Sequence, residues 1–278
     1  MVSNGALAGM AVAAVISAAL PVGAYLIARR RLTLSIRNVA AGAVLFILFA
    51  RGLEWVIFVS VPRAAPQLNA WFMTHTPALA LYGAVVSGVV EETGRYLGLR
   101  YLAKPRQDPG TAVAYAIGHG GAEAIVVGVL GVLGFVLVGL LINADQLDAT
   151  LGDYLSKSTL MQMHGLEQVT GPMMLVGGIE RISCFIFQTA LTLVVWRAVR
   201  DRAHGLLAAA VLAHIALNIP SWLVGTGLLQ VPLWIYEGVY LVPALGVLAI
   251  LISRLQPERT PAAALRSRAT IDRLGRES

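Results

Sequence analysis

Long apolar runs separated by short polar connections make up most of the chain. A helix needs about 20 apolar residues to cross a bilayer, and each run is near that length. The runs predict seven transmembrane helices, at 5–28, 38–61, 77–99, 110–141, 173–196, 205–229 and 231–253. The fourth run is long and starts with glycines, so it is expected to tilt, break or form two helices, which would make eight. The expected fold class is all-α, a polytopic membrane helix bundle.

Arginine and lysine gather in alternate connections. The segments "RRRLTLSIR", "RYLAKPR", "RAVRDR" and "RLQPERTPAAALRSR" follow the first, third, fifth and seventh runs, whereas the other connections hold only Arg63 and Lys157. Basic loops stay in the cytoplasm, which predicts an N-terminus outside and a cytoplasmic C-terminus. The chain is therefore expected to lie in a bacterial-type plasma membrane, with its first run as a span and not a removable signal.

The composition agrees with a protein embedded in a lipid bilayer. Apolar residues are 57% of the chain and charged residues 13%, about half the charged share of soluble domains. The net charge of +6 follows from the basic connections, so no nucleic-acid partner is predicted. The single cysteine, Cys184, excludes an intrachain disulfide and a cysteine metal site. Residues 1–254 are expected to form one transmembrane domain, and residues 255–278 a disordered basic tail.

Several charged and strongly polar residues interrupt the apolar runs. They are Arg51 and Glu54 in the second run, Glu91, Glu92 and Arg95 in the third, His119 and Glu123 in the fourth, Glu180 and Arg181 in the fifth, and His214 and Asn218 in the sixth. A charge near the bilayer centre costs a few kcal/mol, so such residues usually have a function or a partner. Arg51 and Glu54 are expected to form a structural ion pair.

Three of these residues share one depth. Glu91, His119 and His214 lie roughly 8 to 10 residues from the cytoplasmic ends of their runs, or about 12 to 15 Å at the rise of a helix. That level is near the middle of a core about 30 Å thick. Glu123 and Asn218 each follow a histidine by four positions and share its helix face. A site at mid-membrane is therefore predicted.

The two adjacent glutamates cannot have the same role. Arg95 lies four positions after Glu91 and three after Glu92, so it can pair with either. Successive helical residues point about 100° apart. One glutamate is therefore expected to face the site while the other pairs with Arg95.

Two imidazoles and carboxylates around a wet cavity form an arrangement that can activate water. Zinc binds His nitrogen and Glu oxygen and keeps one position open for water. The HExxH signature is absent, so the proposed ligands are His119, His214 and Glu91, from three helices. A remaining carboxylate would act as general base, and Asn218 would stabilise the oxyanion.

Four short motifs occur in order in successive runs, "EETGR", "GHGGAE", "ER" and "HIALN", and span about residues 80 to 220. Together they resemble the YhfC-type intramembrane metalloproteases, which belong with the CAAX-processing, bacteriocin-processing and PrsW-type membrane proteases. The resemblance implies a multi-helix enzyme that hydrolyses a peptide bond of a membrane-embedded or membrane-proximal polypeptide.

The resemblance also implies roles for residues. Glu91 looks like the water-activating residue, His119 its partner, and His214 with Asn218 the oxyanion site; Glu92 is the other candidate base. Four further residues are expected to hold the catalytic side chains in position without contacting the substrate: Arg95, Glu123, Glu180 and Arg181. Whether water is activated on a metal or by Glu and His alone is left open. The chain departs from the CAAX pattern in the spacing of Arg95 and in the glycines around His119, so a prenylated substrate is not implied.

Two other functional classes fit the same residues. A proton-coupled transporter also keeps Glu, Arg and His at mid-membrane, although no paired halves are evident here. A non-catalytic membrane scaffold would use the polar cluster for packing. Solute flux in liposomes would identify a transporter, and activity loss without loss of assembly would separate an enzyme from a scaffold.

Overall fold

The computed structural model describes residues 1–105 and 107–255, and within them the chain is helical and has no strand. The helices are α1 (Asn4–Ala28), α2 (Ile36–Phe46), η1 (Ile47–Leu53), α3 (Glu54–Ala64), α4 (Pro66–Thr74), α5 (Thr76–Leu97), η2 (Gly98–Leu102), α6 (Pro109–Glu123), η3 (Ala124–Gly131), α7 (Val132–Asn143), α8 (Leu147–Leu151), α9 (Lys157–His164), η4 (Gly165–Gln168), α10 (Gly171–Arg200), α11 (His204–Gly225) and α12 (Leu233–Leu255). The expected all-α membrane bundle is confirmed. Residues 256–278 of the expected tail lie outside the described residues.

Two of the spans are continuous helices that contain π-helical turns. The turn η1 joins α2 to α3 in one span of 29 residues, and η3 joins α6 to α7 in one span of 35 residues. Such turns insert an extra residue into the hydrogen-bonding pattern and rotate everything beyond them. The long fourth run therefore neither breaks nor divides, and the eighth helix that it allowed does not form.

Within the described part of the chain, five helices are long and apolar enough to cross a membrane, or six if α4 and α5, bent by 116°, count as one span. The last helix, α12, has a shorter apolar stretch, Trp234–Ile250. Each of the seven expected runs falls on a helix, but the count of seven and the orientation of the termini stay predictions.

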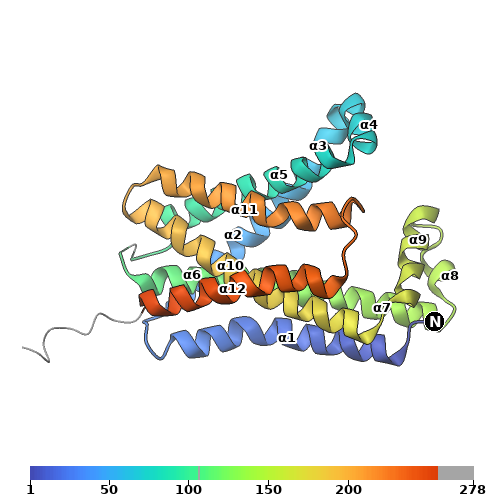
Figure 1. The fold of residues 1–278 in the computed structure, drawn as a ribbon, viewed down its shortest axis with the longest axis horizontal. Helices are drawn as coiled ribbons and strands as arrows, with labels where there is room; N and C mark the ends of the chain where they lie inside the picture. The colour runs from blue at the N-terminus through green and yellow to red at the C-terminus, as the bar shows by residue number, and fades with distance from the viewer. Residues whose placement is uncertain (106, 256–278) are drawn as a thin grey trace, which may run out of the picture.

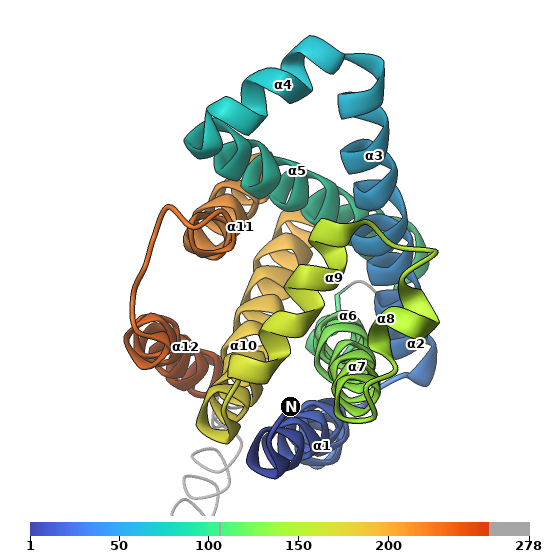
Figure 2. The ribbon, with the colours of Figure 1, turned by 90° about the vertical axis from the view of Figure 1, so that its right-hand side faces the viewer.

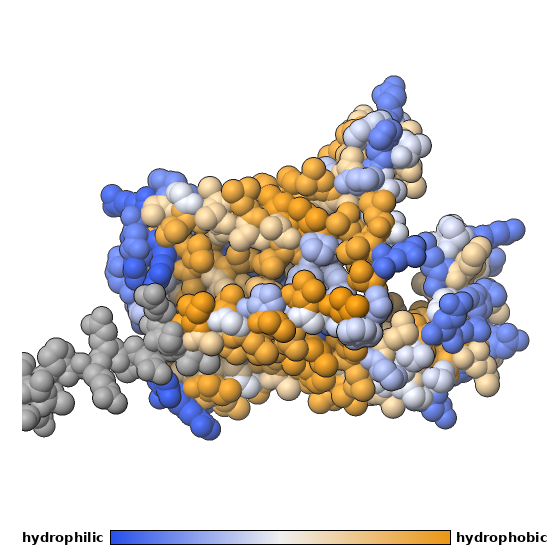
Figure 3. All heavy atoms as spheres, viewed as in Figure 1, coloured by the Kyte–Doolittle hydropathy of each residue, from blue (hydrophilic) through white to orange (hydrophobic). Residues whose placement is uncertain are grey.

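The central helix of the bundle is α10. The helices α1, α6, α11 and α12 pack around it (Figures 1 and 2), and 56% of its most apolar window is buried, against 11–17% in the other spans. On the face shown in Figure 3, apolar residues form a belt across the bundle, with hydrophilic residues at both ends. Polar groups carried by α10 are therefore placed where all the neighbouring helices can reach them.

The crossing of α2 and α6 brings two backbones into direct contact. A Cβ atom on Gly118 would overlap the carbonyl oxygen of Val39, and one on Gly42 would overlap that of Tyr115. Glycine is required at both positions because only a bare Cα leaves this space. The contact fixes the position of the next residue along α6, His119.

The segment from α8 to η4, residues 147–168, forms a small cap beyond the apolar belt. We call it the acidic cap, because it contains Asp148, Asp153 and Glu167. Asn143, just before the cap, binds the start of α1: its Oδ1 accepts from the backbone N–H of Val2 at 2.6 Å, and its Nδ2 donates to the carbonyl of Val2 at 2.9 Å. The cap is thus attached to the bundle at the end opposite the arginine-rich loops (Figure 1).

Candidate active site

The polar residues expected at mid-membrane meet where α5, α6, α10 and α11 pack together. Glu91, Glu92 and Arg95 come from α5, and His119 comes from α6. His214 faces them from α11. All five residues are buried within the bundle, with exposed fractions of 8% or less.

Glu91 lies between the two histidines. Its Oε2 is 3.4 Å from Nε2 of His119, and its Oε1 is 3.8 Å from Nε2 of His214. Gln188 donates from its side-chain amide to Oε2 of Glu91 at 3.3 Å. No arginine is bonded to this carboxylate among the described residues. Glu91 is therefore the glutamate whose charge is not taken up by an arginine, and its side chain is 11% exposed, against 0% for Glu92.

Glu92 is the partner of Arg95. Its Oε1 accepts from Nη1 of Arg95 at 2.5 Å and lies 2.6 Å from Nδ1 of His214. Both Glu92 and Arg95 are completely buried. A buried ion pair of this kind holds its neighbours in place, because breaking it would leave a charge without a partner. Glu92 thus fixes the ring of His214 with Nε2 directed toward Glu91.

Arg95 also reaches the other histidine. Its Nη2 donates to Nε2 of His119 at 2.9 Å and to the side-chain oxygen of Gln188. Arginine has no acceptor, so Nε2 of His119 must be the acceptor and Nδ1 the protonated nitrogen. That Nδ1 is buried and has no partner among the described residues.

Gln188 was not predicted from the sequence, although it connects the whole site. Besides its contacts to Glu91 and Arg95, it donates to Oε2 of Glu123 at 2.7 Å. A signal existed, because Glu180, Cys184 and Gln188 follow one another at intervals of four on one face of α10. Because a neutral amide costs less to bury than a charge, a glutamine within an apolar run is a weaker sign of a functional site than a charged residue, and Gln188 was overlooked for this reason.

A second charged group lies beside the first. Arg181 binds Glu180 at 2.6 Å and Glu123 at 3.5 Å. Glu123 therefore pairs with Arg181. Gln188 joins this group to Glu91.

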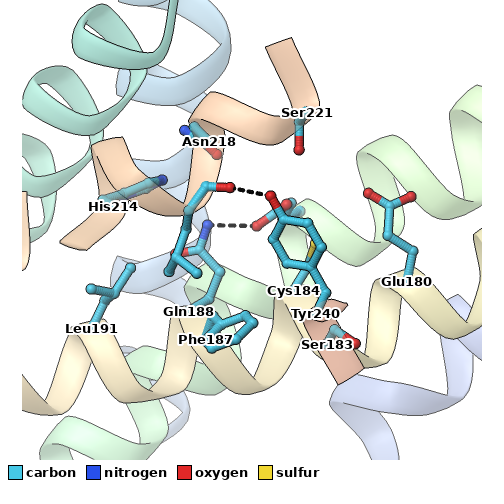
Figure 4. A pocket seen from close by; sticks show the side chains of 12 residues that line it. Glu180, Ser183, Cys184, Phe187, Gln188, Leu191, His214, Asn218, Ser221 and Tyr240 are labelled. Carbon is cyan, nitrogen blue, oxygen red and sulfur yellow. Dashed lines mark hydrogen bonds between the residues drawn. The ribbon is translucent and has the colours of Figure 1, made fainter. Parts of the chain in front are cut away.

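A polar cavity of about 60 Å³ opens beside these residues. The residues that line it are Glu123, Glu180, Ser183, Cys184, Phe187, Gln188, Leu191, His214, Leu217, Asn218, Ser221 and Tyr240 (Figure 4). A water needs roughly 10 to 15 Å³ of such space and two or more polar partners, and the cavity meets both conditions. Asn218 lines it one helical turn from His214, and its amide has no hydrogen-bond partner among the described residues. The site therefore has room for water next to an amide that is free to donate.

Arg51 and Glu54 do not form a salt bridge with each other in the described part of the chain, so the prediction of an ion pair was wrong. Glu54 is buried and accepts from the hydroxyl of Ser87 at 3.4 Å. Arg51 is exposed and lies over the ring of Phe46, 5.4 Å from its centroid. The cause is η1, since its π-helical turn ends between the two residues and changes the angle between positions three apart.

The donor atoms at the centre are of the kind that zinc binds, but their arrangement does not fit a metal. The lone pair of Nε2 of His119 faces the guanidinium of Arg95 at 2.9 Å. Among the described residues, no three His, Cys, Asp or Glu side chains are placed so that they could hold one ion. A metal would reach His119 only if Arg95 moved away, so the chemistry below uses the side chains alone.

Comparison with known proteins points to a single family. A model of the YhfC intramembrane metalloprotease family matches residues 16–240. The chain is also 31% identical over 249 residues to the membrane protein YhfC of Bacillus subtilis (strain 168), a match that covers 89% of this chain and 96% of that protein. No solved structure matches the chain. The matched region includes every residue of the site described above.

Proposed function

Because the chain belongs to the YhfC intramembrane metalloprotease family, we propose that it is a peptidase that hydrolyses a peptide bond in or near the membrane. The observation that carries the proposal is the position of Glu91, buried between His119 and His214 beside a polar cavity. Its substrate in this proposal is a membrane-embedded or membrane-proximal polypeptide, and the protein acts within a bacterial-type plasma membrane.

Glu91 is the general base of the proposed reaction. Its carboxylate takes a proton from a water molecule, and the oxygen of that water forms a bond to the carbonyl carbon of the peptide. The carbonyl electron pair moves to oxygen and gives a tetrahedral intermediate. The C–N bond then breaks, and the amine leaves with the proton that Glu91 received. Gln188 donates to Oε2 of Glu91 and keeps the carboxylate in position for both transfers, while His119, held by Arg95, lies beside it.

The oxyanion is stabilised from α11 in this proposal. The amide of Asn218 donates to it, and His214 in its protonated form donates from Nε2. Preorganised donors of this kind lower the barrier because they need no rearrangement as the charge develops. Glu92 supports this step indirectly, since its bond to Nδ1 sets the orientation of the His214 ring.

The family name implies a metal, and the metal version of the proposal has zinc on His119, His214 and Glu91. Zinc would lower the pKa of a bound water and polarise the carbonyl. The contact between Arg95 and His119 opposes that arrangement. We therefore assign water activation to the Glu91 carboxylate without a metal, and metal analysis of the purified protein tests the choice.

Comparison of newly formed N-termini in bacterial membranes tests the proposed activity. Cells that produce the wild-type protein should contain membrane-protein N-termini that are missing with Glu91→Gln. Glu167→Gln, a change in the acidic cap, is the matched control and should leave them present. Identical N-termini in all three strains would contradict peptidase activity. Solute flux in liposomes would then indicate a transporter, and an intact complex without flux a scaffold.

A further inference from the structure

The helices α11 and α12 run along the face shown in Figures 1 and 3 with a space between them, which we call the seam. Both pack against α10, and two hydrogen bonds cross between them. The hydroxyls of Ser221 and Tyr236 are 2.6 Å apart, and the hydroxyl of Tyr240 donates to the carbonyl of Leu217 at 2.5 Å. Figure 3 shows paler, more polar side chains between the apolar ridges of the two helices. The seam therefore places hydrogen-bonding groups within the apolar belt.

The same hydrogen bonds lie over the polar cavity. Tyr240, Leu217 and Ser221 line it together with His214 and Asn218. Figure 4 shows Tyr240 extending from α12 across the cavity toward α11. Breaking these bonds would open the cavity toward the bilayer and would not disturb the buried ion pair of Glu92.

The backbone of α11 is weakened at this point. Pro220 lies inside the helix and has no N–H, so the carbonyl four residues earlier, that of Ala216, loses its helical donor. In a membrane, carbonyls near an internal proline take partners from neighbouring groups. Tyr240 donates to the next carbonyl, that of Leu217, one residue beyond the carbonyl that Pro220 leaves without a donor, and an incoming N–H group could replace this bond.

A peptide bond inside a transmembrane helix is protected by its own backbone hydrogen bonds. Cleavage requires the segment to unwind, and an unwound backbone in hydrocarbon must find new partners. We propose that the seam between α11 and α12 docks the unwound, extended segment of the substrate, whose backbone takes over the bonds that Tyr236 and Tyr240 make to α11. The inference rests on the proposed peptidase function and adds the surface where its substrate binds.

The rate at which a reagent labels the only cysteine of the chain measures how accessible the seam is, and this measurement does not depend on catalysis. Cys184 is partly buried and lines the cavity. We expect Tyr236→Phe and Tyr240→Phe to raise the rate of maleimide labelling of Cys184 by about fivefold each, the usual effect of one lost hydrogen bond. Tyr25→Phe removes a hydroxyl from α1, far along the chain from the seam, and should leave the rate unchanged. Equal rates in all four folded proteins would overturn the proposal.

A second measurement uses no substitution in the seam. Two synthetic Leu-Ala peptides of about 20 residues, one with a central Gly-Pro-Gly break, are added to Glu91→Gln protein in bicelles. The broken peptide should slow the labelling of Cys184, and the unbroken peptide should not. Equal effects of both peptides would refute docking of an unwound segment. Protection of Cys184 without cleavage by the wild-type protein would retain the docking surface and refute the peptidase function instead.

Discussion

The carboxylate of Glu92 lies 2.6 Å from Nδ1 of His214, although the two residues are 122 positions apart in the chain. Glu92 also holds Arg95, which in turn contacts His119. One buried carboxylate therefore sets the positions of both histidines. Among the described residues, its neighbour Glu91 has no such bond to an arginine, and its carboxylate lies between the two imidazole rings.

The two adjacent glutamates should respond differently to the same substitution. Glu92→Gln removes the charge that balances Arg95, so it should lower the free energy of unfolding by about 3 kcal/mol, as for other broken buried pairs. Glu91→Gln should leave stability close to that of wild type and lower peptidase activity by about 10²- to 10⁴-fold. Thermal unfolding in detergent and a cleavage assay measure the two effects. The assignment fails if the losses of stability and activity are exchanged between the variants.

Zinc content distinguishes the two versions of water activation. Because Arg95 occupies Nε2 of His119, we expect purified protein to hold far less than one zinc per chain, even after zinc is supplied. His119→Ala and His214→Ala should then have no effect on zinc content. Mass spectrometry of the metal in all three proteins makes the comparison. Near-stoichiometric zinc that both substitutions abolish would show that the metal displaces Arg95.

Gly118 should be intolerant of a single methyl group. In Gly118→Ala the new Cβ would overlap the carbonyl oxygen of Val39, and relief requires the backbones of α2 and α6 to separate. Overpacking of this kind costs about 1 to 3 kcal/mol. Gly134→Ala is the matched control, because it lies on the same continuous helix and a Cβ there has no neighbour within 4 Å. Its stability should be unchanged or slightly raised, and an equal loss in both variants would disprove the steric cause.

The acidic cap should loosen as the pH rises. The ring of His164 lies 3.2 Å from Glu167 and 3.4 Å from Asp148, and its hydrogen bonds to these carboxylates raise the pKa of His164 above its usual value. A raised pKa in the folded state stabilises the fold below the unfolded value, about 6.5, and this contribution disappears as the pH passes the raised value.

Amide hydrogen exchange in α9, corrected for the intrinsic effect of pH, should therefore be slower at about pH 5.5 than at about pH 8.5. His164→Gln should remove the difference. His75→Gln, in a different connection, should retain it. A pH effect that survives in His164→Gln would assign it to another group.

The family, the helical fold and the meeting of three helices could be predicted from the sequence, and the family match confirms the first of these. The depth argument for Glu91, His119 and His214 depended only on helix rise and on basic loops that mark one membrane surface. Both are local properties, so neither required knowledge of how the helices pack. The choice between Glu91 and Glu92 did require it, because each can pair with Arg95 along the helix.

Two errors have physical causes of their own. Gln188 was missed because a neutral amide differs little in hydropathy from the apolar run around it. Its side-chain nitrogen nevertheless donates to Glu91 and Glu123, and its side-chain oxygen accepts from Arg95. The pair of Arg51 with Glu54 was expected from α-helical spacing, and a π-helical turn alters that spacing. Single-sequence patterns rarely reveal such turns, because the same residues also fit a regular helix.

The continuous helix from Pro109 to Asn143 has a consequence outside the membrane. Its 35 residues extend for about 50 Å, which exceeds a hydrocarbon core of about 30 Å. The helix that carries His119 is therefore long enough to extend beyond the bilayer, and the acidic cap follows at its C-terminal end. An antibody fragment raised against that cap would gain a rigid handle on a small membrane protein, one that electron microscopy could use to align its images.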